Sequence, residues 1–141
     1  TFWTERIGST AALETLNVME KVKSWQTISS IGKNIKKKWF NIARAHKVKI
    51  SIQGMNALPN FFFNSENNLK YKTLISQEML KKNILASSSV YCSVAHEEKI
   101  LIKYFDVLDD IFFKISKVEK NQNSIDEFLQ SETCISGMRN K

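Results

Sequence analysis

The sequence is poor in residues that cross-link or break a chain. Its 141 residues include one proline, four glycines and two cysteines. Two cysteines are too few for a disulfide framework, and Cys92 and Cys134 lack the spacing of metal ligands. We therefore expect two buried or chemically indifferent thiols, no metal site and, by default, a reducing cytoplasmic compartment.

Long hydrophobic runs are also missing. No apolar stretch approaches the roughly 20 residues that cross a bilayer, and no signal-peptide pattern opens the chain. We therefore expect no membrane partner. What is present, 43% apolar and 11% aromatic residues, is enough to build the core of one domain.

Arginine is scarce although the chain is basic. The net charge is +7, yet only three of the 21 basic residues are arginines. Bidentate recognition of bases and phosphates favours arginine. The densest basic cluster, Lys36-Lys37-Lys38, lies in a helical stretch and is interpreted as a solvated edge. We expect no nucleic-acid partner, but a stand-alone basic α/β binding module for an acidic partner remains an alternative.

The spacing of apolar residues predicts four helices, over residues 8–22, 24–47, 69–82 and 97–119, and a short helical piece over 124–129. Ser24 is a candidate N-cap of the second helix. Apolar residues recur at steps of three and four in the second and last helices, which indicates one buried face on each. These residues are Trp25, Ile28, Ile35, Trp39 and Ile42, and Ile100, Leu101, Tyr104, Phe105, Leu108, Ile111, Phe112 and Ile115.

Three segments are typical of strands. Val48, Ile50 and Ile52 alternate with polar residues over 48–53, and Gly54 ends that run. Residues 58–63 form a second expected strand, and 84–93 a short pair around the turn Ser87-Ser88-Ser89. The predicted fold is an α/β (α+β) small domain, in which a small, mostly antiparallel sheet is covered by helices 24–47, 69–82 and 97–119.

The candidate chemical residues do not form a complete catalytic set. His96 at a helix start is expected to cap backbone donors or to support a loop, and His46 to complement a helix C-terminus. The serine turn at 87–89 has no accompanying base. Asp106, Asp109 and Asp110 are expected to be solvated, and Trp3, Trp25 and Trp39 to be packing residues.

The first sixteen residues resemble a segment of the class III pyridoxal-phosphate (PLP) aminotransferases. That segment reads roughly Gly-Thr-Phe-small-Gly-Asn-Pro-Leu-Ala and continues into a small-residue helix that ends Ala-Thr-Leu. Thr1 falls on the family's threonine, and Ala11-Ala12-Leu13 and Thr15-Leu16 fall on its helix. The resemblance implies that Thr1 binds the phosphate of the PLP held by the neighbouring subunit.

Three further motifs resemble the same family. The Gly54-Met55 pair and Phe61-Phe62-Phe63 are similar to the family's Gly-x-Met and the aromatic strand after it. The segment 78–88 is similar to Met-Leu-x-x-Gly-Val-Tyr-Leu-Ala-Pro-Ser. Residues 93–98, Ser-Val-Ala-His-Glu-Glu, are similar to a Ser-x-Ala-His-Thr-x-Glu pattern that opens the last helix. The combination is nearest to the glutamate-1-semialdehyde aminomutase group, and it covers about residues 1–118.

The resemblance implies an organisation and a function. Residues 1–22 would be the end of a large PLP-binding domain and a connecting helix, residues 23–120 a C-terminal small domain, and 121–141 a polar tail. The Lys that forms a Schiff base with the cofactor would lie upstream of Thr1, so no catalytic residue falls within the chain. The whole enzyme would be a cytoplasmic homodimer with active sites at the subunit interface. It would act on small-molecule amino donors and acceptors, and this fragment alone would be inactive.

The sequence departs from the family pattern at three places. Glu5-Arg6 replaces the Asn-Pro that follows the phosphate-binding threonine, and the stretch from Ser89 to Ser93 is about three residues shorter than in the aminomutases. No arginine lies between Arg44 and Arg139 to hold a substrate carboxylate. These departures point away from glutamate semialdehyde and towards a substrate without a carboxylate at that end.

Overall fold

A computed structural model describes residues 3–135 of the chain. The elements follow the order α1 (Ile7–Val22), α2 (Ser24–His46), β1 (Ile50–Gln53), β2 (Asn60–Phe63), α3 (Asn68–Leu80) and α4 (Glu98–Glu119), and a short 3-10 helix, η1, spans Ile125–Glu127. The four predicted helices are confirmed to within about two residues at each end, because long periodic patterns are the most reliable signal.

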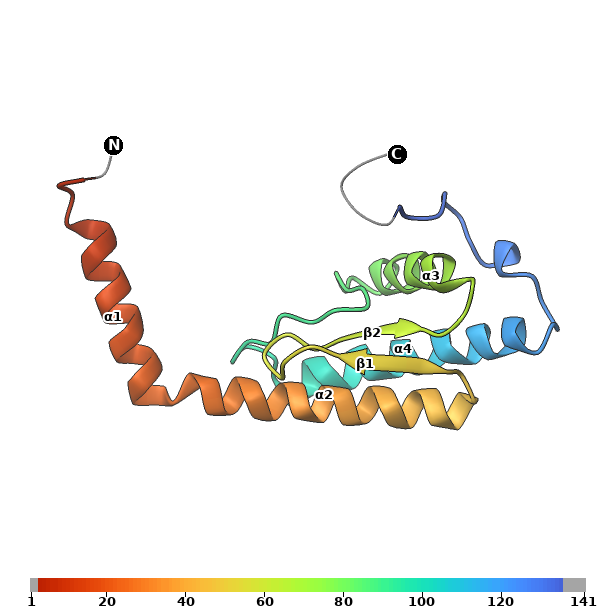
Figure 1. Ribbon diagram of the computed structural model, residues 1–141, viewed down its shortest axis with the longest axis horizontal. Coiled ribbons are helices and arrows are strands. Elements are labelled where there is room, and N and C mark those ends of the chain that lie inside the picture. Colours follow the sequence, from red (N-terminus) through yellow and green to blue (C-terminus); the bar gives the residue numbers. More distant parts are fainter. Residues whose placement is uncertain (1–2, 136–141) are drawn as a thin grey trace.

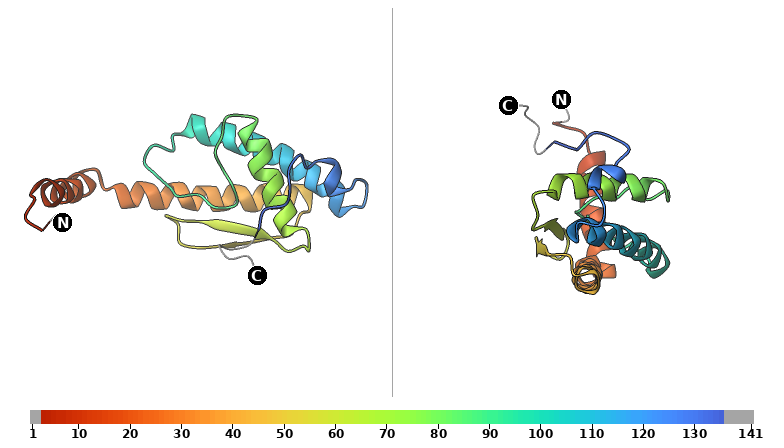
Figure 2. Two further views of the ribbon diagram at one scale, coloured as in Figure 1. Left: turned by 90° about the horizontal axis from the view of Figure 1, so that it is seen from above. Right: turned by 90° about the vertical axis from the view of Figure 1, so that its right-hand side faces the viewer.

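The two strands form an antiparallel hairpin that places alternate residues on opposite faces. Ile50 pairs with Phe63 and Ile52 with Phe61 on the inner face, while Ser51 pairs with Phe62 on the outer face. Phe61 and Phe63 are buried, whereas Phe62 is exposed. β1 lies along α2 and β2 along α3, with α4 behind the hairpin (Figure 1). The helices therefore cover one face of the sheet, as the end-on view in Figure 2 also shows.

The core lies between the hairpin and helices α2, α3 and α4. Phe112 of α4 contacts the two inward-facing aromatic rings of β2, with centroids 6.0 Å from Phe61 and 5.4 Å from Phe63. Trp39 of α2 packs edge-on against Phe61 at 4.7 Å. Burying side chains of this size is the main source of stability in a small domain, since each removes a large apolar area from water.

The expected short pair of strands over 84–93 is wrong, because neither segment is a strand of the sheet. Only an isolated bridge joins Ser89 to Asn60. The backbone N–H of Phe61 donates to Ser88, and Val90 donates to the carbonyl of Pro59. Pro59 has no N–H with which to return a bond, so a regular ladder cannot extend past it.

The close approach of the hairpin to α2 depends on a glycine. A Cβ on Gly32 would lie 1.7 Å from the carbonyl oxygen of Asn56, in the loop between the strands. The amide of Asn56 donates to the hydroxyl of Ser29 one turn earlier, at 3.2 Å. Gly32 therefore lets the loop rest directly on the helix backbone.

Helix α1 extends away from the rest of the chain (Figure 1). None of its residues is buried, although it carries Ile7, Leu13, Leu16 and Val22. It is joined to α2 through Lys23 alone, which has left-handed dihedral angles (φ 50°, ψ 44°). Two expectations fail near this junction. Ser24 is the first residue of α2 and makes no cap, because its buried hydroxyl has no partner among the described residues, and Trp25 is half exposed.

Candidate functional site

Thr1, the expected phosphate ligand, lies outside the residues that the structure describes. Trp3, which was expected to pack, is 95% exposed. Glu5 has a clear local role: its two carboxylate oxygens accept the backbone N–H groups of Ile7 and Gly8, each at 2.8 Å. A carboxylate suits a helix N-terminus because the first N–H groups lack partners within the helix. The residue that departs from the family's Asn therefore supplies the side-chain acceptors for the start of α1, from the position before the N-cap residue Arg6.

Three of the four family-like motifs meet in space. The segment after α3 runs beside the hairpin, where Cys92 donates its N–H to the carbonyl of Ala57. The chain then turns through 93–97 into α4. Asn83, at the place of the glycine in the family pattern, has φ 59°, the left-handed conformation that Gly and Asn adopt most readily. The described part of the first motif, residues 3–16, lies apart, in and before helix α1 (Figure 1).

His96 supports the loop that precedes α4. Its Nδ1 accepts the backbone N–H of Ser93 at 3.0 Å, while the Ser93 hydroxyl accepts the N–H of Ala95 at 3.2 Å. Both expected roles are met, because the ring accepts a backbone N–H and thereby supports the loop. The N-cap of α4 itself is Glu97, which carries no side-chain cap bond. Because Nδ1 is an acceptor, the neutral ring carries its proton on Nε2.

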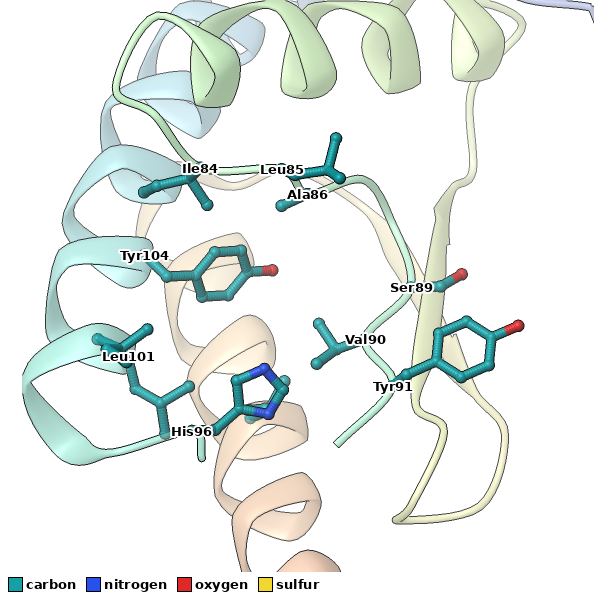
Figure 3. A pocket seen from close by; sticks show the side chains of 11 residues that line it. Ile84, Leu85, Ala86, Ser89, Val90, Tyr91, His96, Leu101 and Tyr104 are labelled. Atoms are coloured by element: carbon teal, nitrogen blue, oxygen red, sulfur yellow. The ribbon is translucent and has the colours of Figure 1, made fainter. Parts of the chain in front are cut away.

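A pocket of about 290 Å³ lies beneath the 84–91 segment, between α2 and α4. Ile35, Ile84, Ala86, Val90 and Leu101 supply apolar walls. Figure 3 shows the phenol of Tyr104 and the imidazole of His96 directed into this space, and Leu85 and Tyr91 directed away from it.

The hydroxyl of Tyr104 is held by a second helix. It accepts a hydrogen bond of 2.9 Å from Nε1 of Trp39, a contact that joins residues 65 apart in sequence. Burial raises the pKa of Tyr104 above its usual range, and the bond from Trp39 offsets only part of that rise. The phenol therefore stays protonated. Sequence reasoning placed Tyr104 among the core residues and could not detect this pocket, because its walls come from three separate segments.

The remaining candidate residues have structural roles. Asp109 is exposed, as expected, and its carboxylate also contacts Nε2 of His46 at 3.0 Å. This contact ties the end of α2 to α4. Asp106 and Asp110 are exposed, as expected. Tyr71 donates to Glu119 at 2.6 Å, and burial first, then this bond, raises its pKa to about 12.

The lysines and the possible metal ligands of the described part of the chain can be located directly. Every lysine there is exposed or half-buried, and residues 3–135 hold no group of three potential metal ligands. Lys36 donates to the carbonyl of Gly54 at 2.6 Å, whereas Lys37 and Lys38 are exposed, as expected of a solvated edge. The cysteines are free, and burial raises the pKa of Cys92.

Within the residues described, no helix is both long and apolar enough to span a membrane.

Comparisons with known proteins give one fold relationship. No family model matches the chain, and no curated protein matches it either. The structure is similar to that of the FumI protein of Sphingopyxis sp. MTA144, solved in its PLP internal aldimine form. The TM-score is 0.67 at 16% sequence identity, over 84% of this chain and 29% of the other. The chain therefore spans less than a third of the length of that neighbour and shares the fold of the part it matches.

Proposed function

We propose that this chain is the C-terminal part of a homodimeric, PLP-dependent aminotransferase or aminomutase of class III. In this proposal Thr1 contacts the cofactor phosphate across the subunit interface. The small domain, residues 23–120, covers the substrate. The observation that carries the proposal is the similarity in fold to a PLP-binding protein over 84% of the chain.

The positions of the motifs add support. Met79-Leu80 ends α3, residues 93–98 lead into α4, and the aromatic motif forms β2. A fold similarity alone does not specify a function. Motifs that were identified from the sequence and that coincide with the ends of helices and with a strand of this fold are a second, separate line of support. The glutamate-1-semialdehyde aminomutase group is the proposed nearest relative.

The division of chemical work follows from the residues present. PLP supplies an electron sink when bound, and the protein supplies binding, orientation and electrostatics. The resemblance to the class III enzymes implies that the lysine that binds the cofactor lies in a segment before Thr1. We therefore assign the described residues to covering the substrate and excluding water, and we assign no proton transfer to them.

The decisive experiment uses the longer protein that the proposal requires, with roughly 250–300 further residues before Thr1 by analogy with the family's size. Thr1→Ala removes a charge-assisted hydrogen bond to a phosphate, worth roughly 1.5–3 kcal/mol. The dissociation constant of PLP should therefore rise by about ten- to a hundredfold. Trp3→Ala, a change at a neighbouring exposed residue, serves as the matched control.

A subunit-mixing experiment tests the dimer. A heterodimer of Thr1→Ala with a subunit that lacks the cofactor-binding lysine should retain one working site. The first subunit supplies the lysine and the second supplies the intact threonine. Unchanged PLP affinity in the Thr1→Ala homodimer would exclude Thr1 as a phosphate ligand. Amino-group transfer by the 141-residue chain on its own would overturn the assignment as a C-terminal part.

One surface favours the alternative, a stand-alone basic module for an acidic partner. A hollow of about 490 Å³ between α3 and α4 is lined by Lys81, Lys82, Lys114 and Lys117, against only Glu78 and Asp110. Poly-glutamate should then bind the 141-residue chain in a salt-dependent manner. Lys82→Gln together with Lys117→Gln should weaken that binding, whereas Lys37→Gln together with Lys38→Gln should not. No binding at low salt would remove this alternative.

A further inference from the structure

The pocket beneath residues 84–91 presents hydrogen-bond donors in an apolar setting. The Tyr104 oxygen already accepts the N–H of Trp39, and among residues 3–135 its own proton has no acceptor. His96 uses Nδ1 as an acceptor towards Ser93, so the neutral ring directs an N–H into the same space. Both groups therefore face the pocket as donors. Tyr104 is 6% exposed, so leaving its proton without an acceptor is costly, whereas the half-buried His96 adds a second, partly accessible donor.

The walls exclude charged ligands. No Asp, Glu, Lys or Arg lines the pocket. A carboxylate would therefore be buried without a cation, and an ammonium without an anion, and each would lose its hydration. A neutral oxygen acceptor avoids both costs and satisfies the two donors. The pocket volume of about 290 Å³ exceeds the roughly 150 Å³ of cavities that hold benzene, so the pocket has room for a ligand larger than a single ring.

We propose that this pocket binds a small neutral carbonyl compound, its oxygen facing Tyr104 and His96 and its apolar body packed against Ile35, Ala86 and Leu101. The proposal goes beyond the amino-transfer function and does not depend on it, because the site is complete within the described residues. The proposal also holds if the chain is a stand-alone binding module. Its failure would leave the outcome of the cofactor experiments above unchanged.

The probe is 4-phenyl-2-butanone, titrated into the 141-residue chain and followed by ¹H–¹⁵N NMR. Binding at about 1 mM or tighter is expected from the usual affinity per atom of small ligands, with shift changes centred on residues 84–91 and the first half of α4. Two analogues of the same size, 3-phenylpropanoate and 4-phenylbutan-2-amine, should bind at least tenfold more weakly. Equal binding of either analogue would overturn the proposed preference for a neutral acceptor.

Two variants locate the site. Ala86→Leu fills the pocket and should abolish binding, whereas Met55→Ser changes an apolar residue that is 71% exposed and does not line the pocket, and should leave binding unchanged. The spectrum of each free variant verifies its fold. Retained binding in a folded Ala86→Leu chain, or no binding to the unmodified chain, would overturn the proposal.

The donors are tested through the ligand itself. The C=O stretch of the bound ketone should move to lower wavenumber than in water-free solvent, because hydrogen bonding weakens the carbonyl bond. Tyr104→Phe should reduce that shift and weaken binding by about tenfold, the loss of one hydrogen bond. If Ala86→Leu misfolds, this variant still decides the matter, since an unchanged stretch and affinity in a folded Tyr104→Phe chain would exclude the tyrosine as a donor.

Discussion

Helices α1 and α4 are both rich in apolar residues, but they differ completely in what those residues contact. α4 buries nine residues against α2, α3 and the hairpin, while α1 buries none. Each helix is regular and carries apolar residues, so the difference lies in whether other elements of the fold pack against it. An apolar stripe therefore specifies which side of a helix seeks a partner, and only the rest of the fold decides whether the partner is present.

The largest expected effect separates buried from exposed tryptophans. Trp39 is fully buried and joins α2 to β2 and Tyr104. Trp39→Ala should lower the free energy of unfolding by about 3–5 kcal/mol in urea denaturation. Trp25→Ala, a change at the half-exposed start of the same helix, should alter it by less than about 0.5 kcal/mol. Equal losses would mean that α2 is buried along its whole length.

Gly8 in α1 and Gly32 in α2 allow the same comparison between an exposed and a packed helix, through the effect of an added methyl group on stability. Gly32→Ala should cost about 1–3 kcal/mol, because the new Cβ meets the backbone of Asn56 and the hairpin loop must move. Gly8→Ala meets only the flexible carboxylate of Glu5 at 2.5 Å. It should leave global unfolding unchanged, since the better helix propensity of alanine offsets a shifted cap. A stable Gly32→Ala chain would contradict the close contact.

A smaller effect comes from the ion-pair cluster that links α3 to α4. Partial burial raises the pKa of Glu78, but hydrogen bonds from Lys114, Lys81 and Gln77 outweigh it and lower the pKa to about 2. Glu78→Gln should therefore cost about 1 kcal/mol at pH 7, a value kept low by solvent screening.

The pH dependence has a definite sign. The folded pKa is depressed, so this stabilisation is present above the unfolded value of 4.5 and is lost as the pH falls towards 2. The difference in unfolding free energy between the unmodified chain and Glu78→Gln should accordingly shrink over that window. A difference that stays constant from pH 7 to 2 would show that the carboxylate charge plays no part.

The smallest effect is expected from removing α1 altogether. None of residues 3–22 is buried, so deleting residues 1–22 should change the free energy of unfolding of the remainder by no more than about 0.5 kcal/mol. Thermal unfolding followed by near-UV circular dichroism measures this. A loss of several kcal/mol would show that the helix is part of the cooperative unit and would end the contrast with α4.

The helices and the hairpin could be predicted because each depends on residues close together in the sequence. The irregular course of 84–93 could not, because it depends on the missing N–H of Pro59 in a neighbouring segment. Trp25 was misjudged because periodicity gives the face of a helix and does not reveal where its neighbours stop. The Trp39–Tyr104 bond and the His46–Asp109 contact join positions more than 60 residues apart, and nothing local announces such pairs.

Because Lys23 alone joins α1 to α2, a small change in its dihedral angles moves the far end of α1 by a large distance. A helix of 16 residues is about 24 Å long, so a rotation of about 10° at its base sweeps the far end through about 4 Å. A phosphate contact from Thr1 tolerates errors far smaller than that. If Thr1 holds a phosphate, its position must therefore be fixed by whatever packs against Leu13, Leu16 and Val22, because the single connecting residue Lys23 does not fix the orientation of α1.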